Sequence, residues 1–140
     1  MKDIRANFDS AAYQAFAKES VVLSLLKLEL KDEVILSKTA ELLKQKKFTK
    51  ANSITNLLYA LAKFKYVHTD TVWIASAIES IMNEPKIDLY LSCRNLWNLY
   101  ALDYKSEAAL EKFSLCIKEA DGSKLNELDI ANALRAFAHF

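Results

Sequence analysis

Four polar residues that can donate hydrogen bonds recur at steps of 38 residues. They are Lys18, Asn56, Arg94 and Asn132. One helical turn further along, the same step relates Val21, Tyr59, Trp97 and Arg135. Another turn on, it relates Leu25, Lys63, Ala101 and His139. If these segments are successive helices of one array, amide and guanidinium donors lie beside aromatic and cationic groups on a continuous surface.

These residue types suit the recognition of single-stranded RNA. Amides and guanidinium groups address base edges, aromatic rings stack on bases, and a lysine such as Lys63 meets phosphates. A purely structural role stays open, because polar residues occupy the solvent face of any amphipathic helix. Tyr59 and Trp97 can equally wedge between neighbouring units as part of the core. The candidate RNA-binding residues are Lys18, Asn56, Arg94, Asn132, Tyr59, Lys63, Trp97 and Arg135.

A basic run provides a second candidate site. Its members are Lys44, Lys46, Lys47 and Lys50. Cations are favoured near the negative end of a helix dipole, so the run is typical of a solvated helix end. A basic turn of this kind also suits a contact with ribosomal RNA.

Side chains for catalysis or metal binding follow no recognisable pattern. One glycine excludes a glycine-rich phosphate loop, and neither a Ser/His/Asp arrangement nor a pair of carboxylates stands out. The histidines lack Cys, Asp or Glu partners at the spacing of metal ligands. Cys93 and Cys116 lie within apolar helical patterns and are interpreted as reduced core thiols. We predict a non-enzymatic protein that holds neither a cofactor nor a metal.

The elements that position these residues come from a motif written three times, at residues 58–64, 96–102 and 134–140. With Gly 1 and Pro 1 among 140 residues, few positions suit tight turns, which favours long helices joined by short links. Apolar residues such as Ile54, Leu58 and Leu61 fall three or four apart, on one face of a helix. The sequence predicts an all-α fold, an α-solenoid of about seven helices built from helical hairpins of 38 residues.

A single array is expected, with units at about residues 9–47, 48–85 and 86–123 and a partial unit at 124–140. The first helix should begin near Asp9 or Ser10. Later helices are predicted to open at Asp32, Thr49, Asp70, Asp88 and Asn126. The last one shows Leu134, Phe137 and Phe140 on one side without a following unit to cover them. We expect that another chain covers this apolar end or, as we favour, that the sequence is part of a longer array.

Charge and hydropathy exclude several classes of partner. The formal net charge is +1, so no large field of one sign steers the chain towards nucleic acid or an anionic membrane. No run approaches the 18 apolar residues that suggest a membrane span. Residues 1–10 contain Asp3 and Asp9 and lack an apolar stretch, so they resemble neither a secretory signal nor a transit peptide.

Hairpins at this spacing, with a first helix that reads N-L-L-Y-A-L-A-K-F-K-Y at residues 56–66, resemble the octotricopeptide repeat family. They also resemble the heptatricopeptide and FAST-kinase-like regions that precede RAP domains, and the resemblance covers about residues 9–140. It implies a mitochondrial protein that binds single-stranded or ribosomal RNA, in RNA processing, in translation or within the mitochondrial ribosome. The alternative function is a protein scaffold, a subunit or assembly factor of a large mitochondrial complex whose partners are other protein chains.

Overall fold

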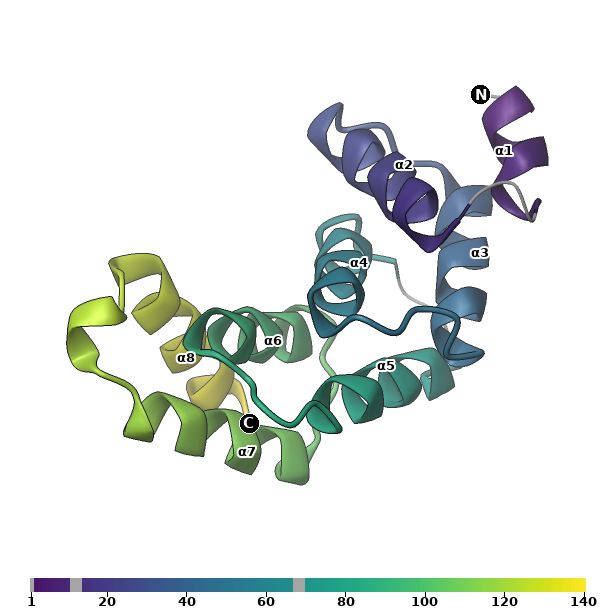
Figure 1. The fold of residues 1–140 in the computed structure, drawn as a ribbon. Helices are drawn as coiled ribbons and strands as arrows, with labels where there is room; N and C mark the ends of the chain where they lie inside the picture. Colours follow the sequence, from purple (N-terminus) through teal and green to yellow (C-terminus); the bar gives the residue numbers. More distant parts are fainter. Residues whose placement is uncertain (1, 11–13, 67–69) are drawn as a thin grey trace.

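The computed structural model describes residues 2–10, 14–66 and 70–140. These residues form eight α-helices and one short 3-10 helix, Gly122–Lys124, and none of them lies in a β-strand (Figure 1). The α-helices are α1 (Lys2–Phe8), α2 (Ala15–Lys27), α3 (Glu33–Lys44), α4 (Ala51–Lys63), α5 (Val72–Met82), α6 (Leu89–Ala101), α7 (Glu107–Glu119) and α8 (Glu127–His139). The prediction of an all-helical protein is confirmed.

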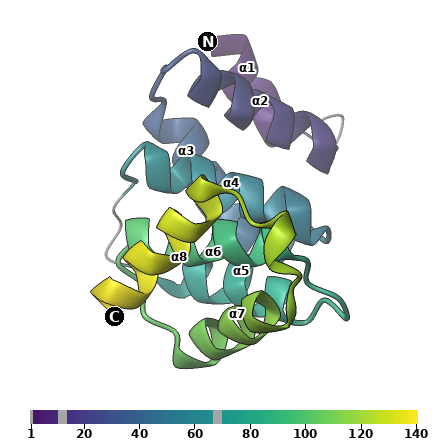
Figure 2. The same ribbon diagram turned by 90° about the vertical axis from the view of Figure 1, so that its left-hand side faces the viewer.

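The helices pack in two rows. In one row α2 packs against α4, α4 against α6 and α6 against α8. In the other row α1 contacts α3, α3 packs against α5, and α5 contacts α7. The rows are joined where α4 packs against α5 and α6 against α7 (Figures 1 and 2). The first row carries every residue of the predicted RNA-binding set.

One core runs through both rows, from Phe8 of α1 to Ala136 of α8. On α4 the side chains of Ile54, Leu58 and Leu61 repeat at helical spacing and are almost completely buried. Burying a side chain of this size stabilises a fold by about 1.5–3 kcal/mol. The apolar periodicity read from the sequence therefore corresponds to the packing faces of the helices.

The first step along the first row is shorter than predicted. The four helices begin at Ala15, Ala51, Leu89 and Glu127, which are steps of 36, 38 and 38 residues. Lys18, placed 38 residues before Asn56, is therefore not its structural equivalent, and Ser20 occupies the corresponding turn. The column that was expected to begin at Lys18 is wrong in its first member.

The prediction of about seven helices missed α1. The predicted start of the first helix near Asp9 or Ser10 is wrong, because α1 ends at Phe8 and α2 begins at Ala15. α1 has only seven residues, too few for a helical period to stand out. Phe8 is completely buried, and the Arg5 guanidinium lies 2.7 Å from a carboxylate oxygen of Asp32 at the start of α3. Tertiary contacts therefore hold this helix in place.

Several predicted helix starts are confirmed by their side-chain caps. Asp32, Asp88 and Asn126 accept hydrogen bonds from backbone N–H groups in the first turns of α3, α6 and α8. At α4 the prediction was wrong, because the N-cap is Lys50 rather than Thr49 and its side chain makes no capping bond. The caps that formed are the residue types that best satisfy unpaired N–H groups at a helix start.

Four helices end in a left-handed residue that is not glycine. Glu29, Lys46, Lys65 and Asp103 have φ angles of 55°, 54°, 51° and 50°. After α4, the Tyr66 N–H donates to the Leu61 carbonyl at 2.9 Å and the Lys65 N–H donates to the Ala62 carbonyl at 3.0 Å. These paired bonds form a Schellman motif, in which a Cβ atom in the left-handed position adds strain.

Replacing Lys65 by glycine is expected to raise the free energy of unfolding by about 0.5–1 kcal/mol, because glycine adopts this backbone geometry without a Cβ clash. Lys65→Ala is the control, since it removes the same side chain and retains the Cβ atom. Urea unfolding followed by circular dichroism measures both variants. Equal stability of the two variants would show that the turn carries no such strain.

The ion pair between α1 and α3 makes the stability of the chain depend on pH. Burial raises the pKa of Asp32, but hydrogen bonds from Arg5 and from the Ile35 N–H lower it more, so the carboxyl titrates below its ordinary value of 3.8. The depressed pKa means that the stabilisation is complete above pH 3.8 and is lost as the pH falls through the folded-state pKa.

Arg5→Ala is expected to lower the free energy of unfolding at pH 7 by about 1 kcal/mol, a value that allows for the half-exposed guanidinium. The difference from the wild type should shrink below pH 3.8, where Asp32 becomes protonated in both proteins. Urea titrations at several pH values measure the effect. Lys31→Ala, which removes an exposed pair with Glu33, is the control and should change little. An unchanged difference at low pH would contradict the assignment to Asp32.

Candidate functional site

Residues of the predicted donor column make contacts within the protein or are buried in it. The Asn56 amide on α4 donates a hydrogen bond to the Glu19 carboxylate on α2, with 3.1 Å between the heavy atoms. Asn132 on α8 is only 8% exposed. Lys18 on α2 lies with its ammonium group 5.9 Å from the ring centre of Phe8. Asn56 and Lys18 thus make contacts between helices and Asn132 is buried, so the three form no continuous open surface.

Four of the predicted residues come together between α4 and α6. The Tyr59 and Trp97 rings lie 5.0 Å apart between centroids and are tilted by 50°. The Arg94 guanidinium carbon lies 4.1 Å from the centre of the Tyr59 ring. The Lys63 ammonium lies 5.0 Å from the Trp97 ring and 5.5 Å from the Tyr59 ring. We call Tyr59, Lys63, Arg94 and Trp97 the cation–aromatic cluster.

The cation–aromatic cluster joins two helices and also presents charge. Each cation attracted to a ring face contributes about 0.5–1 kcal/mol at a partly exposed site. Tyr59, Arg94 and Trp97 are half-buried and Lys63 is exposed, so the cluster is accessible at its edge. Arg135, the remaining member of the predicted set, is exposed on α8 and belongs to no contact of this cluster.

The basic run is partly neutralised by acidic partners on α5 and before it. Lys44 lies 2.9 Å from a carboxylate oxygen of Asp70, and Lys46 lies 2.8 Å from one of Glu79. The hydrogen bond to Asp70 raises the pKa of Lys44. Lys47 and Lys50 are exposed, and Lys50 stands at the start of the next helix. The four lysines therefore do not act as one free basic patch.

A buried polar network between α4 and α6 was not predicted from the sequence. The Asn95 amide donates to the Thr55 hydroxyl and to the Leu91 carbonyl, each at 2.9 Å. The Asn98 amide donates to the Thr55 carbonyl and to the Asn95 side-chain oxygen, each at 3.2 Å. Thr55, Asn95 and Asn98 are completely buried. The signal available in the sequence was the position of two asparagines within an apolar helical stripe.

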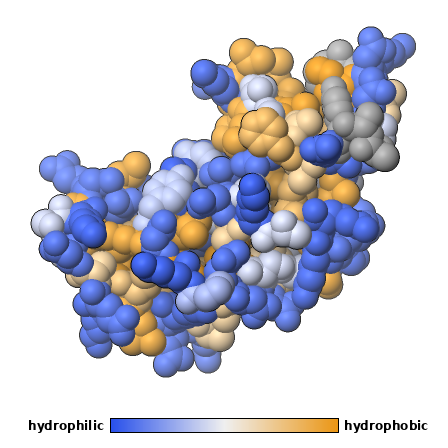
Figure 3. Space-filling model, viewed as in Figure 1, coloured by the Kyte–Doolittle hydropathy of each residue, from blue (hydrophilic) through white to orange (hydrophobic). Residues whose placement is uncertain are grey.

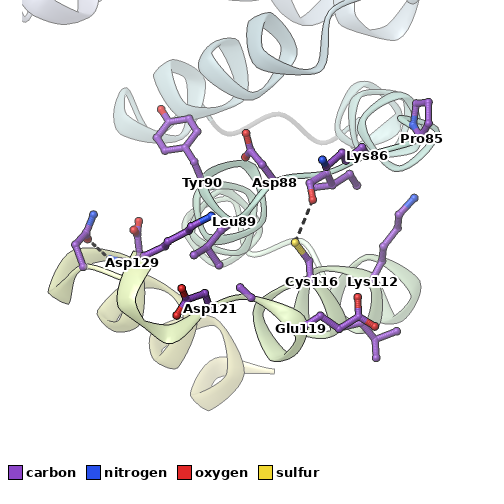
Figure 4. A pocket seen from close by; sticks show the side chains of 15 residues that line it. Pro85, Lys86, Asp88, Leu89, Tyr90, Lys112, Cys116, Glu119, Asp121 and Asp129 are labelled. Carbon is purple, nitrogen blue, oxygen red and sulfur yellow. Dashed lines mark hydrogen bonds between the residues drawn. The ribbon is translucent and has the colours of Figure 1, made fainter.

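The surface also has a cleft beside α6 and α7. It has a volume of about 940 Å³ and lies between the segment that precedes α6, one side of α7 and the residues around the start of α8 (Figure 4). Lysines and carboxylates both line it, and the Cys116 thiol lies 3.1 Å from the Ile87 carbonyl oxygen.

The second cysteine, Cys93, is buried on α6 and does not line the cleft. Burial raises the pKa of the Cys93 thiol to about 11, which disfavours the reactive thiolate.

The described residues form neither a cluster of metal ligands nor a helix that could span a membrane. No three His, Cys, Asp or Glu residues gather where they could hold a metal ion. Within the same residues, every helix is too short or too polar to cross a lipid bilayer.

Large apolar side chains are exposed along α8. Ile130, Leu134 and Phe137 are 45%, 62% and 44% exposed and lie four and three residues apart, on one face of the helix. We call these three residues the α8 stripe. Phe140, which was grouped with the open apolar end, packs partly buried against the core, with its ring 4.8 Å from that of His139. Figure 2 looks onto α8, with α7 beside it.

The α8 stripe corresponds to faces that are buried elsewhere in the first row. Thirty-eight residues earlier, α6 places Ser92, Leu96 and Leu99, and each is completely buried. A further step earlier, α4 places Ile54, Leu58 and Leu61, which are 2%, 0% and 0% exposed. Only on α8 does this face stay open within the described residues.

Comparison of the chain with models of protein families, with curated proteins and with solved structures gives no match. The resemblance to octotricopeptide repeats therefore stays a prediction from the sequence.

Proposed function

We propose that the chain is a non-enzymatic helical scaffold that binds a partner protein through the α8 stripe. The observation that carries the proposal is the exposure of Ile130, Leu134 and Phe137 at positions that α4 and α6 bury. Contiguous exposed apolar side chains with polar surroundings are typical of protein interaction sites. Burying a fully exposed side chain of this size contributes about 1.5–3 kcal/mol, and covering the exposed half of each of these three contributes about half of that.

The placement of the polar residues supports the same function. Asn56 is bonded to Glu19 and Arg94 is stacked on Tyr59, so both already have partners within the chain. The net charge of +1 provides little long-range attraction for RNA. The α8 stripe, in contrast, leaves three large apolar side chains exposed at positions that α4 and α6 bury.

The architecture belongs to the same proposal. We infer a solenoid of helical hairpins repeated at about 38 residues, as in octotricopeptide proteins, because the helices of the first row pack in order and begin at nearly constant steps. A role as a subunit or assembly factor of a large mitochondrial complex follows from that resemblance. No observation tests the compartment, so the mitochondrial location stays a prediction.

A photo-crosslinking residue in place of Phe137 is expected to form an adduct with a protein in the cells that express the chain. The adduct should resist nuclease and be sensitive to protease. Leu134→Glu in the same chain should reduce its yield about tenfold, because a buried carboxylate opposes an apolar contact. Gel shift and mass spectrometry of the adduct measure the outcome.

The same photo-crosslinker in place of Arg135 is the control, since this exposed residue lies on another face of α8. It should yield little adduct. A nuclease-sensitive adduct at Phe137, or none at all, would contradict the scaffold function.

The cation–aromatic cluster favours a second candidate function, which is binding of single-stranded RNA. Lys63 and Arg94 lie over the Tyr59–Trp97 ring pair at its partly exposed edge. Proteins bind single-stranded nucleic acid with cationic side chains that meet the phosphates and aromatic rings on which the bases stack. In this function the cations would meet phosphates and the ring edges would meet bases.

If RNA binds there, a random single-stranded pool should bind with an affinity that falls about tenfold between 50 and 200 mM salt, as two phosphate contacts require. The double variant Lys63→Ala, Arg94→Ala should lose this salt-sensitive binding. Fluorescence anisotropy measures it, and Lys65→Ala is the control for loss of a nearby lysine. Binding that persists in the double variant would remove the cluster as an RNA site.

A further inference from the structure

An open cavity adjoins the cation–aromatic cluster. It has a volume of about 440 Å³ and lies between the end of α2, the residues that follow α2, and the end of α4. We call it the α2–α4 cavity, and it is lined by Leu26, Glu29, Lys31, Tyr59, Lys63 and Phe64. Tyr59 and Lys63 thus belong to both the cavity and the cluster. Cavities of about 300–1,000 Å³ hold small organic ligands in proteins, so this one is large enough for a nucleotide.

Part of the α2–α4 cavity is apolar and aromatic. Leu26 of α2 and Phe64 at the end of α4 line it together with the ring of Tyr59. The Arg94 guanidinium carbon lies 4.1 Å from the centre of the Tyr59 ring, and this contact stabilises the position of the ring. Aromatic rings bind the flat faces of nucleobases by stacking. This part of the cavity therefore favours a planar ligand.

Lys63 gives the cavity a positive charge that no carboxylate neutralises. Its ammonium group lies over the Tyr59 and Trp97 rings, and Lys63 makes no ion pair within the part of the chain that the structure describes. The other lining cation, Lys31, lies 2.8 Å from a carboxylate oxygen of Glu33. Lysine binds phosphate as a point charge. The cavity therefore favours a ligand that carries a phosphate, with Lys63 as its partner.

Glu29 brings a carboxylate to the same cavity. Its N–H donates to the Leu26 carbonyl at 3.1 Å in the turn after α2, so the backbone fixes the point from which its side chain extends. Within residues 2–10, 14–66 and 70–140, the Glu29 carboxylate has neither a hydrogen bond nor an ion pair. An ionised carboxylate only accepts hydrogen bonds, and it accepts two together from a fork of adjacent N–H groups. The planar ligand should present such a fork at its edge.

Among the RNA bases, guanine presents this fork. Its ring N–H and its exocyclic amino group lie side by side on one edge, as the N–H groups of a guanidinium do. Adenine and cytosine place a ring nitrogen acceptor beside the amino group, and uracil places a carbonyl oxygen on each side of its N–H. Those acceptors would face a carboxylate oxygen without a donor between them, which opposes binding. A carboxylate at the base edge therefore selects guanine.

We propose that the α2–α4 cavity binds one guanine nucleotide. The base lies against Tyr59 and Phe64, its ring N–H and amino group donate to Glu29, and its phosphate meets Lys63. The nucleotide is either free or one unit of a single strand. For a strand, the inference deepens the second candidate function and rests on it, because the cations of the cluster then meet the phosphates while the cavity selects one base.

Short strands that differ in one base test the site on the full chain. A fluorescein-labelled oligouridine with guanosine at one central position is compared with the same strand carrying inosine or uridine there. Inosine keeps the ring N–H of guanosine and lacks the amino group. Fluorescence anisotropy should show about fivefold tighter binding of the guanosine strand than of the other two, because the carboxylate accepts a second hydrogen bond from guanosine alone.

Glu29→Gln should abolish the preference for guanosine without lowering the affinity for oligouridine, because it replaces one acceptor oxygen with an amide donor of the same size. Glu29 is exposed, so this variant leaves the core intact. Glu111→Gln is the control, since it removes the same charge from an exposed position on α7 that does not line the cavity. Equal affinity of the wild type for the three strands, or an unchanged preference in Glu29→Gln, would overturn the inference.

Free nucleotides distinguish the two sources of the ligand. Guanosine, inosine and uridine monophosphates are titrated into the isotope-labelled chain, and the amide signals of Tyr59 and Lys63 are followed by NMR. Shifts that saturate with guanosine monophosphate at a lower concentration than with the other two indicate a free nucleotide, and a response to the guanosine strand alone indicates a strand.

The outcomes also separate the guanine site from the functions proposed above. Salt-sensitive binding of strands that requires Lys63 but shows no preference for guanosine would overturn the guanine site and leave RNA binding at the cluster standing. Binding of neither the strands nor guanosine monophosphate would overturn both. The scaffold function of the α8 stripe is tested independently by the crosslinking at Phe137.

Discussion

Packing between neighbours is the constraint on which this protein depends. α2, α4, α6 and α8 have thirteen residues each, a length at which an isolated helix is marginal in water. Each must bury apolar side chains against adjacent helices, and α4 and α6 do so against both a hairpin partner and their row neighbours. α8 packs against α6 but keeps large apolar side chains open. The proposed binding surface is thus the place where large apolar side chains of the first row stay exposed at positions that α4 and α6 bury.

The polar residues of the first row follow the same constraint. A side chain that points along the row meets the next helix, so donors there find partners within the chain. Asn56 reaches Glu19, Arg94 stacks on Tyr59, and Asn132 is buried. A column of donors in a repeat sequence therefore indicates helix-to-helix contacts as readily as a ligand surface. Burial and partner distances, which the sequence does not contain, separate the two cases.

The all-helical class and three N-caps could be predicted because each depends on local patterns, such as the apolar spacing of α4 or the carboxylate of Asp88. The step of 36 residues between α2 and α4 could not be predicted, because α2 is apolar on most sides, as the orange atoms over it in Figure 3 show, and its apolar pattern fixes no register. α1 could not be predicted, because it is held in place by the burial of Phe8 and by the contact of Arg5 with Asp32, which is distant in the sequence. At the candidate site, the exposed α8 face was predicted in part, but Ile130 was missed and Phe140 was misplaced.

The buried amides between α4 and α6 have a consequence for how similar helices tell one another apart. The first row contains helices of one length and related sequence, and interchangeable neighbours invite wrong pairing during folding. Among the described residues, only the α4–α6 contact holds completely buried side-chain amides, on Asn95 and Asn98, bonded to Thr55. Another helix without a matching polar group would remove the bonds from Asn95 and Asn98 to Thr55, which contribute about 0.5–1.5 kcal/mol each, whereas the bonds to Leu91 and between the two asparagines lie within α6. The bonds of Thr55 to Asn95 and Asn98 thus favour α4 over the other first-row helices as the neighbour of α6.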